Sequence, residues 1–558
     1  MTHDRKTRRL NLTGLTLVAL AWLAAGQPAR GQDLHEVIRA RVEQLLDTGM
    51  LEVAGVSIAA RTLLPKIYEA RAFEPAWRNA AQIDSLLELI DEAYREGLDP
   101  VDYHDAAVRA ARERFVDPGA MPLDERAALD IMLTDSVIRL GYHLRFGKVD
   151  PVVLDSDWNL SRELVDQDPV MTLQAAIDAP SMRDFAAQVL PRNPLYRRIT
   201  VALADYRAIA AGGGWPEVPD GQTLRPDMSD ARVPMLEQRL KVSGDLPGTV
   251  GAPEAPPNAT GGPVYTGEVV AAVQRFQERH GLAADGVIGR ATIAALNVPV
   301  ERRIDQMRAS LERARWVLAD LGSEFVAVNI AGFRLYLVRD GDVVWRTRVQ
   351  VGRPYRRTPV FKAELTYLVF NPTWTVPPTI LREDVLPAVR RNTGYLAGRN
   401  IDVIDNGGRI VDPTSIDWSG QRSFPYRFVQ RPGATNALGR VKFMFPNDHS
   451  VYLHDTPSRD LFERESRAFS SGCIRVENPL ELAQQLLGSK WDAARIDAVI
   501  AGGRTDTVFL DDPVDVLLLY WTAEVDETGR VAFWPDVYER DPGVIEELGK
   551  PFTASPVL

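Results

Sequence analysis

The chain has a single cysteine, Cys473, among its 558 residues, and its neighbours favour a reactive thiol. A lone cysteine cannot form an intramolecular disulfide, so its thiol is either an inert buried group or a free nucleophile. Gly472, directly before it, allows a sharp turn and the close approach of a substrate carbonyl. The hydroxyls of the two preceding serines and the guanidinium of Arg475 are surroundings that lower a thiol pKa.

A nucleophilic thiol needs a base that takes its proton. Of the seven histidines, only His449 and His454 lie in the predicted β domain that contains Cys473. Residues 451–454 alternate in polarity, so Tyr452 and His454 are predicted to face one side of a strand. His449 lies in a Pro-Asn-Asp-His-Ser turn, where an exposed histidine is expected. We therefore predict that His454 is the base.

The sequence lacks the residues for several other kinds of chemistry. It contains no His-Glu-x-x-His motif and no paired cysteines that would bind a metal ion. It also lacks a glycine-rich phosphate loop followed by Lys and Ser or Thr. The net charge of -11 argues against a nucleic-acid partner, which normally requires a basic face. We expect no metal, no cofactor and no nucleic acid.

The N-terminal residues resemble an export signal. Four basic side chains precede an apolar run over residues 10–25, and Ala29-Arg30-Gly31 follows as a small-x-small cleavage pattern. The apolar run is short for a bilayer span. We predict that residues 1–31 form a cleaved signal peptide, with an uncleaved membrane anchor as the alternative.

The rest of the chain is long enough for several domains. Apolar residues recur at helical spacing up to about residue 322, and after Phe325 the period changes to that of strands. A long segment rich in Pro, Gly and aromatic residues interrupts the strands. The predicted parts are a helical scaffold (33–230), a small helical unit (231–300), a helical connector (301–322), a β domain (323–530) with an insertion at about 373–440, and a C-terminal extension (531–558).

The small unit carries the motifs AVQRFQ at residues 272–277 and DGVIG at residues 285–289. They resemble the peptidoglycan-binding domain of many wall enzymes. The alternative is an unrelated three-helix module with a glycine-rich turn. A Pro/Gly-rich insertion at residues 244–263 interrupts the start of this domain. The resemblance implies three helices and contact with the wall polymer.

His454 and the run SSGCIR at residues 470–475 resemble the L,D-transpeptidase (YkuD-type) catalytic domain. Ser471 departs from the pattern, because many relatives have His directly before the Gly, and this leaves His454 as the base. The runs NPTWTVP (371–377), LHDTP (453–457) and YWTA (520–523) resemble the large periplasmic branch of this family. That branch combines a helical scaffold, a small three-helix peptidoglycan-binding domain and a mainly-β catalytic domain with a lid insertion.

The resemblance implies acyl transfer through a thioester on Cys473. The thiolate attacks the third residue of a stem peptide and releases D-Ala, and an amine from a neighbouring stem completes a 3-3 cross-link. The N–H groups of Gly472 and Cys473 are the expected oxyanion donors. The group that orients His454 is expected at Asp455, where the family typically uses a backbone carbonyl and where the carboxylate is a second candidate.

Tyr452, Ser471 and Arg475 are expected to bind the substrate. Ordinary strand packing of Tyr452 and a turn-fixing role for Arg475 are the alternatives. The implied partners are stem peptides, glycan and carbapenem-type inhibitors, and the implied location is the periplasm. Two other functions stay open: a cysteine hydrolase of peptidoglycan, in which water takes the acyl group, and a wall-binding scaffold without activity.

Overall fold

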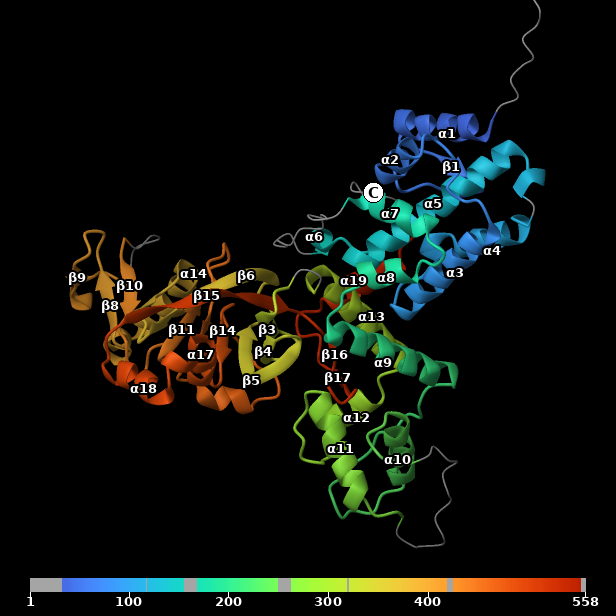
Figure 1. The fold of residues 1–558 in the computed structure, drawn as a ribbon. Coiled ribbons are helices and arrows are strands. Elements are labelled where there is room, and N and C mark those ends of the chain that lie inside the picture. The colour runs from blue at the N-terminus through green and yellow to red at the C-terminus, as the bar shows by residue number, and fades with distance from the viewer. Residues whose placement is uncertain are drawn as a thin grey trace, which may run out of the picture.

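The computed structural model describes residues 33–116, 118–154, 168–248, 262–318, 321–418 and 425–552. Figure 1 shows a helical body, a small helical unit and a β-rich body that meet around two helices, α9 (Pro194–Ala211) and α13 (Val300–Val317). This arrangement confirms the predicted fold class. The predicted signal peptide lies outside the described residues. Within the described ranges, no helix is both long and apolar enough to cross a membrane.

The helical body is built around α5 (Leu123–Phe146), most of whose residues are buried. A buried carboxylate on this helix, that of Asp135, accepts hydrogen bonds from the backbone N–H groups of Ala59 and Ala60 and pairs with Arg139 at 2.6 Å. This carboxylate therefore fixes the loop after a small hairpin. The other elements are α1 (Leu34–Thr48), β1 (Glu52–Val53), β2 (Val56–Ser57), α2 (Leu63–Ala70), α3 (Ala80–Arg95), α4 (Asp105–Arg114), α6 (Pro151–Leu154), α7 (Pro169–Asp178) and α8 (Arg183–Val189).

The small unit consists of α10 (Val233–Val242), α11 (Gly267–Arg279) and α12 (Arg290–Leu296). Val273 and Phe276 on one face of α11 are fully buried in its core. The same core contains Val218 and Leu224, so residues before the predicted start at 231 pack with this unit.

The β-rich body contains a nine-stranded sheet with the order β13-β5-β14-β12-β11-β6-β15-β3-β4. Because β5 also pairs with β4, the sheet closes on itself and encloses an apolar core. The elements are β3 (Glu324–Asn329), β4 (Arg334–Arg339), β5 (Asp342–Gly352), β6 (Phe361–Phe370), β11 (Val441–Met444), β12 (Leu453–His454), β13 (Ala468–Ser470), β14 (Ile474–Val476), α17 (Pro479–Leu487), α18 (Ala493–Ala501) and β15 (Asp506–Leu519).

The segment between β6 and β11 forms a subdomain with its own hydrophobic core, which includes Val389, Val403 and Phe428. We call residues 374–430 the insertion subdomain. Its four strands have the order β7-β10-β8-β9. The elements are β7 (Trp374–Thr375), α14 (Pro378–Ile380), a helical turn (Leu381–Val385), α15 (Leu386–Arg391), α16 (Gly394–Gly398), β8 (Ile401–Ile404), β9 (Ile410–Val411) and β10 (Arg427–Gln430).

The predicted C-terminal extension ties the bodies together. The hairpin of β16 (Ala523–Val525) and β17 (Val531–Phe533) packs near α9 and α13. After it, α19 (Asp541–Gly549) contributes Val544 and Leu548 to the core of the helical body. Arg313 of α13 pairs with the buried Asp541 at 2.5 Å. The chain thus returns from the β domain to the helical body through α19.

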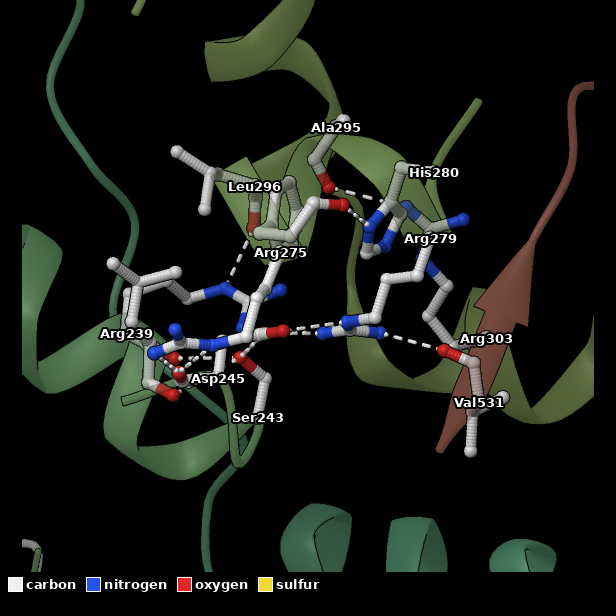
Figure 2. A network of polar contacts seen from close by, with 12 residues as sticks. Arg239, Ser243, Asp245, Arg275, Arg279, His280, Ala295, Leu296, Arg303 and Val531 are labelled. Atoms are coloured by element: carbon white, nitrogen blue, oxygen red, sulfur yellow. Dashed lines mark hydrogen bonds and ion pairs between the residues drawn. The ribbon is translucent and has the colours of Figure 1, made fainter. Parts of the chain in front are cut away.

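Buried charges fix the three-helix unit to this junction (Figure 2). Arg279 of α11 pairs with Asp245 at 2.5 Å and donates to the carbonyl of Val531 in β17. Arg303 of α13 donates to the carbonyl of Ala295 in α12. These contacts hold the unit against both the connector helix and the C-terminal hairpin.

Candidate active site

Cys473 lies in the loop between β13 and β14 and is half-buried. Gly472 has a φ of 118°, which an L-residue rarely adopts, so the turn before the thiol requires glycine. Two side chains hold the loop: Ser470 Oγ donates to Cys473 O at 2.5 Å, and Thr358 Oγ1 donates to Gly472 O at 2.8 Å. The thiol is therefore presented on a fixed backbone.

His454 is brought to the thiol by strand pairing. β12 runs parallel to β14, with His454 opposite Arg475 and Leu453 opposite Ile474. Continuing this register places Cys473 opposite Tyr452. Because side chains alternate along a strand, Tyr452, His454, Cys473 and Arg475 share one face of the sheet. The predicted nucleophile and base thus lie on one face of two adjacent strands.

The imidazole of His454 is oriented by a backbone carbonyl. Its Nδ1 lies 2.5 Å from the carbonyl oxygen of Asp455, and a carbonyl oxygen can only accept. Nδ1 therefore carries the proton, and Nε2 is left with a lone pair that can accept one. The carboxylate of Asp455 points elsewhere: it binds Arg459 at 2.6 Å and Arg440 at 3.2 Å. Of the two candidates at Asp455, the structure has the backbone carbonyl in this place.

Both members of the pair are neutral in this arrangement. Burial, together with the charges of Arg475 and Lys442, lowers the pKa of His454 to about 3, and the hydrogen bond to the Asp455 carbonyl opposes this shift. Burial raises the pKa of Cys473, and hydrogen bonds from Tyr452 and the charge of Arg475 oppose this. A neutral imidazole on the same face of the sheet can act as the base that takes the proton of a neutral thiol.

Tyr452 faces both catalytic candidates. Its ring lies edge-on to the ring of His454, with centroids 5.7 Å apart, and its backbone and hydroxyl both favour the thiolate form of Cys473. Burial raises the pKa of Tyr452, and a hydrogen bond with Trp374 of β7 lowers it. The insertion subdomain therefore reaches the active site through Trp374.

Ser471 and Arg475, the other two predicted substrate residues, lie on either side of the thiol. Arg475 is half-buried and donates to Gln350 Oε1 at 3.1 Å, while its Nε has no partner among the described residues. Ser471 is exposed, and its Oγ accepts from Arg356 at 2.8 Å. Arg475 is thus tied to β5, and its charge acts on Cys473.

One of the two expected oxyanion donors is engaged. The N–H of Gly472 donates to Ser470 Oγ at 3.1 Å, because the sharp turn brings this N–H back over the serine. Within the described part of the chain, no group accepts from the N–H of Cys473. The Gly472 N–H is therefore engaged within its own loop, whereas the Cys473 N–H is open among the described residues.

Several residues that position the site were not predicted. The loop 353–358 packs behind Cys473, and Thr358 is fully buried there. Tyr538, from the C-terminal extension, donates to Gly352 O at 2.5 Å and accepts from the N–H of Thr358. The only signal in the sequence was the turn-rich run GRPYRRTP after a strand. Within the described residues, no three His, Cys, Asp or Glu side chains gather to hold a metal ion.

Three parts of the chain match known domain families. Residues 62–203 match a scaffold domain, residues 229–296 match a peptidoglycan binding domain, and residues 323–516 match the L,D-transpeptidase catalytic domain. Cys473 and His454 lie within the third match. The predicted resemblance of the whole arrangement is confirmed.

A curated relative agrees with these matches. The chain is 38% identical, over 266 residues, to a Haemophilus influenzae protein classed as an L,D-transpeptidase. The aligned residues make up 47% of this chain and 54% of that protein. The chain therefore spans about half the length of this curated relative.

Two solved structures are also similar. An L,D-transpeptidase from Stackebrandtia nassauensis is 15% identical, over 55% of this chain and 96% of that one, with a TM-score of 0.21. The Ldtfm-avibactam carbamoyl enzyme is 14% identical, over 36% of this chain and 49% of that one, with a TM-score of 0.17. At such TM-scores neither structure adds to the argument.

Proposed function

Because the chain combines an L,D-transpeptidase catalytic domain with a scaffold domain and a peptidoglycan-binding domain, we propose that it is an exported cysteine L,D-transpeptidase that forms 3-3 cross-links in peptidoglycan. The observation that supports this most is the pair of Cys473 and His454 on one face of the sheet, with His454 Nδ1 bound to the Asp455 carbonyl. This pair lies in the part of the chain that matches the catalytic domain.

The first half of the reaction forms a thioester. The proton of Cys473 passes to His454 Nε2 as the sulfur attacks the carbonyl of the third stem residue. The resulting imidazolium is stabilised by the hydrogen bond from Nδ1 to Asp455 O. The negative oxygen is held by the Cys473 N–H, a donor of a kind whose removal costs about 2.7–4 kcal/mol in studied enzymes. The C–N bond to D-Ala then breaks, and His454 gives its proton to the leaving amine.

The second half transfers the acyl group. An amine from a neighbouring stem attacks the thioester, and His454 takes the proton that this amine loses. The C–S bond breaks, and the thiolate recovers its proton from His454. Arg475, whose charge acts on the thiol, binds a stem carboxylate, and Tyr452 and Ser471 contact the acyl chain. Carbapenem-type inhibitors acylate the same sulfur.

The proposal places the enzyme in the periplasm, with its three-helix unit on the wall polymer. The matched peptidoglycan binding domain supports this placement. The predicted signal peptide would direct export.

Cross-linking is tested with purified protein and disaccharide tetrapeptide, with products identified by mass spectrometry. We expect D-Ala release and a 3-3 dimer from the wild type, none from Cys473→Ala, and a rate lower by about 10²–10⁴ from His454→Ala, as is typical for a lost general base. His449→Ala is the matched control, since it removes a histidine outside this pair. Cross-linking by Cys473→Ala would refute the proposal, and D-Ala release without dimers would identify a hydrolase.

A further inference from the structure

Arg356 joins the insertion subdomain to the nucleophile loop, which is residues 471–473 between β13 and β14. It lies in the loop 353–358, and its Nη1 donates to Ser471 Oγ at 2.8 Å and to Asp384 Oδ2 at 2.8 Å. Its Nη2 donates to Glu383 Oε2 at 2.6 Å. Both acids belong to the helical turn at the start of the insertion subdomain, so one guanidinium binds the two parts at once.

Burial distinguishes Arg356 from its acidic partners. Its side chain is 12% exposed, whereas those of Glu383 and Asp384 are 42% and 46% exposed. The guanidinium is therefore largely covered, while the two acids are more exposed to solvent. Charge-assisted hydrogen bonds of this kind are short and strong compared with neutral ones.

Other contacts between the two bodies, among the described residues, lie at Asn371 and Trp374. The insertion subdomain has a core of its own, separate from that of the closed sheet. Its base is fixed at Asn371, whose side chain donates to the carbonyls of Val499, Ile500 and Arg504 and whose φ is 45°. Trp374 meets Tyr452 above the site. Arg356 thus holds the subdomain on the side of Ser471, away from this fixed base.

We propose that Arg356 is a positioning residue that holds the insertion subdomain closed over Cys473 and couples this closure to the position of Ser471. When the contacts to Glu383 and Asp384 break, the subdomain opens and the thiol becomes accessible. Closure keeps water from the thioester and favours an amine as the acceptor. The consequence for acyl transfer rests on the proposed function, but the accessibility of the thiol does not.

The accessibility of Cys473 is measured as its rate of alkylation by iodoacetamide, which is uncharged. We expect Arg356→Gln to react about three- to tenfold faster than the wild type, since a lost charge-assisted hydrogen bond shifts an equilibrium by this order. Arg382→Gln is the matched control, because Arg382 binds the same Glu383 at 2.9 Å but does not reach Ser471. This control should react like the wild type. Equal rates for Arg356→Gln and the wild type would overturn the proposal.

A second variant changes only the insertion side. The double variant Glu383→Gln/Asp384→Asn leaves Arg356 and Ser471 in place and should also speed alkylation. Addition of about 1 M NaCl to the wild type should have the same effect, because the Debye length is then about 3 Å and the ion pairs are screened. Alkylation unchanged by both would contradict the proposal even if Arg356→Gln were poorly folded. Loss of the Arg356 cation can only raise the pKa of a nearby thiol and so slow alkylation, which means that a faster reaction of Arg356→Gln reports access. If alkylation responds as expected while the wild type makes no cross-links, the proposed function fails and the closure stands.

Discussion

The Nδ1 atom of His454 lies 2.5 Å from the carbonyl oxygen of Asp455, its own chain neighbour. A backbone acceptor at this place cannot change its protonation state, so it fixes the tautomer of His454 wherever the imidazole is neutral. The carboxylate of Asp455 binds Arg440 and Arg459 instead. Orientation of the base and anchoring of the surrounding loop are thus performed by different atoms of Asp455.

Replacement of the Asp455 carboxylate should affect stability more than catalysis. Asp455→Asn keeps the backbone carbonyl, so kcat should stay within about fivefold of the wild type, as for a residue that makes no transition-state contact. Weakened bonds to Arg440 and Arg459 should lower the unfolding free energy by about 1–3 kcal/mol. Steady-state kinetics and urea unfolding measure the two effects. A loss of about 10² or more in kcat at unchanged stability would show that the carboxylate acts on His454.

The lowered pKa of His454 predicts an unusual pH profile. In the free enzyme His454 stays neutral down to about pH 3, and Cys473 stays protonated through neutral pH because burial raises its pKa. We therefore expect kcat/KM to be flat between about pH 5 and 8, since this parameter reports the free enzyme. Rates with disaccharide tetrapeptide across this range provide the test. An acid limb near the ordinary histidine pKa of about 6.5 would contradict the buried, neutral imidazole.

The same shift predicts how stability depends on pH. The folded-state pKa of His454 is below its unfolded value, so the unfolded chain takes up a proton that the folded chain refuses. Stability is fully present above about pH 6.5 and is lost as pH falls toward about 3, by at most about 1.4 kcal/mol per pH unit. His454→Asn should lose this part of the slope. His280 is also buried with a lowered pKa and contributes to the same slope. The quantity to measure is therefore the difference between the wild type and His454→Asn in the slope of unfolding free energy against pH. Identical slopes would refute the lowered pKa of His454.

The sequence predicted what depends on local pattern. Alternation over residues 451–454 predicted that Tyr452 and His454 share one face of a strand. In the structure, the parallel pairing of β12 with β14 puts Cys473 on that same face. The helical scaffold, the three-helix unit and the β domain followed from the period of apolar residues. By contrast, the contact of Tyr538 with Gly352 joins positions far apart in the chain, and no periodicity reports such a contact. The engagement of Gly472 N–H by Ser470 depends on the detailed shape of one turn, which residue types alone do not define.

Thr358 offers a test of how the nucleophile loop is held. Its hydroxyl donates to Gly472 O at 2.8 Å and accepts from Gly352 N–H at 2.9 Å in a fully buried place. Thr358→Val keeps the shape but leaves two backbone groups unpaired, at a cost of about 1–3 kcal/mol in unfolding free energy. We expect kcat to fall about tenfold or more, because small displacements of reacting atoms are costly. Thr358→Ser restores the hydroxyl and should recover both quantities, and no recovery would show that packing of the methyl group matters instead.

The position of the three-helix unit depends on the ion pair of Arg279 and Asp245, both of which are nine-tenths buried or more. Arg279→Met leaves Asp245 buried without its partner, which typically costs about 3–5 kcal/mol, and removes the hydrogen bond to Val531. We expect this unit to unfold in a separate, earlier transition in calorimetry. Cross-linking of soluble tetrapeptide should continue, while cross-linking in isolated sacculi should fall, because the unit no longer holds the wall polymer at a fixed place beside the catalytic domain.

Arg275→Gln is the control for this prediction, since among the described residues the Arg275 side chain hydrogen-bonds to the backbone carbonyl of Asp245 and to no residue of β17. It should retain activity on both substrates. A stability loss in Arg279→Met with equal activity on sacculi would mean that the unit acts as a tether whose orientation is irrelevant. The expected result, a loss of activity on sacculi alone, would show that the buried charge pair at the junction affects which substrate reaches Cys473. The cause would be the fixed geometry of the bodies that meet at α13.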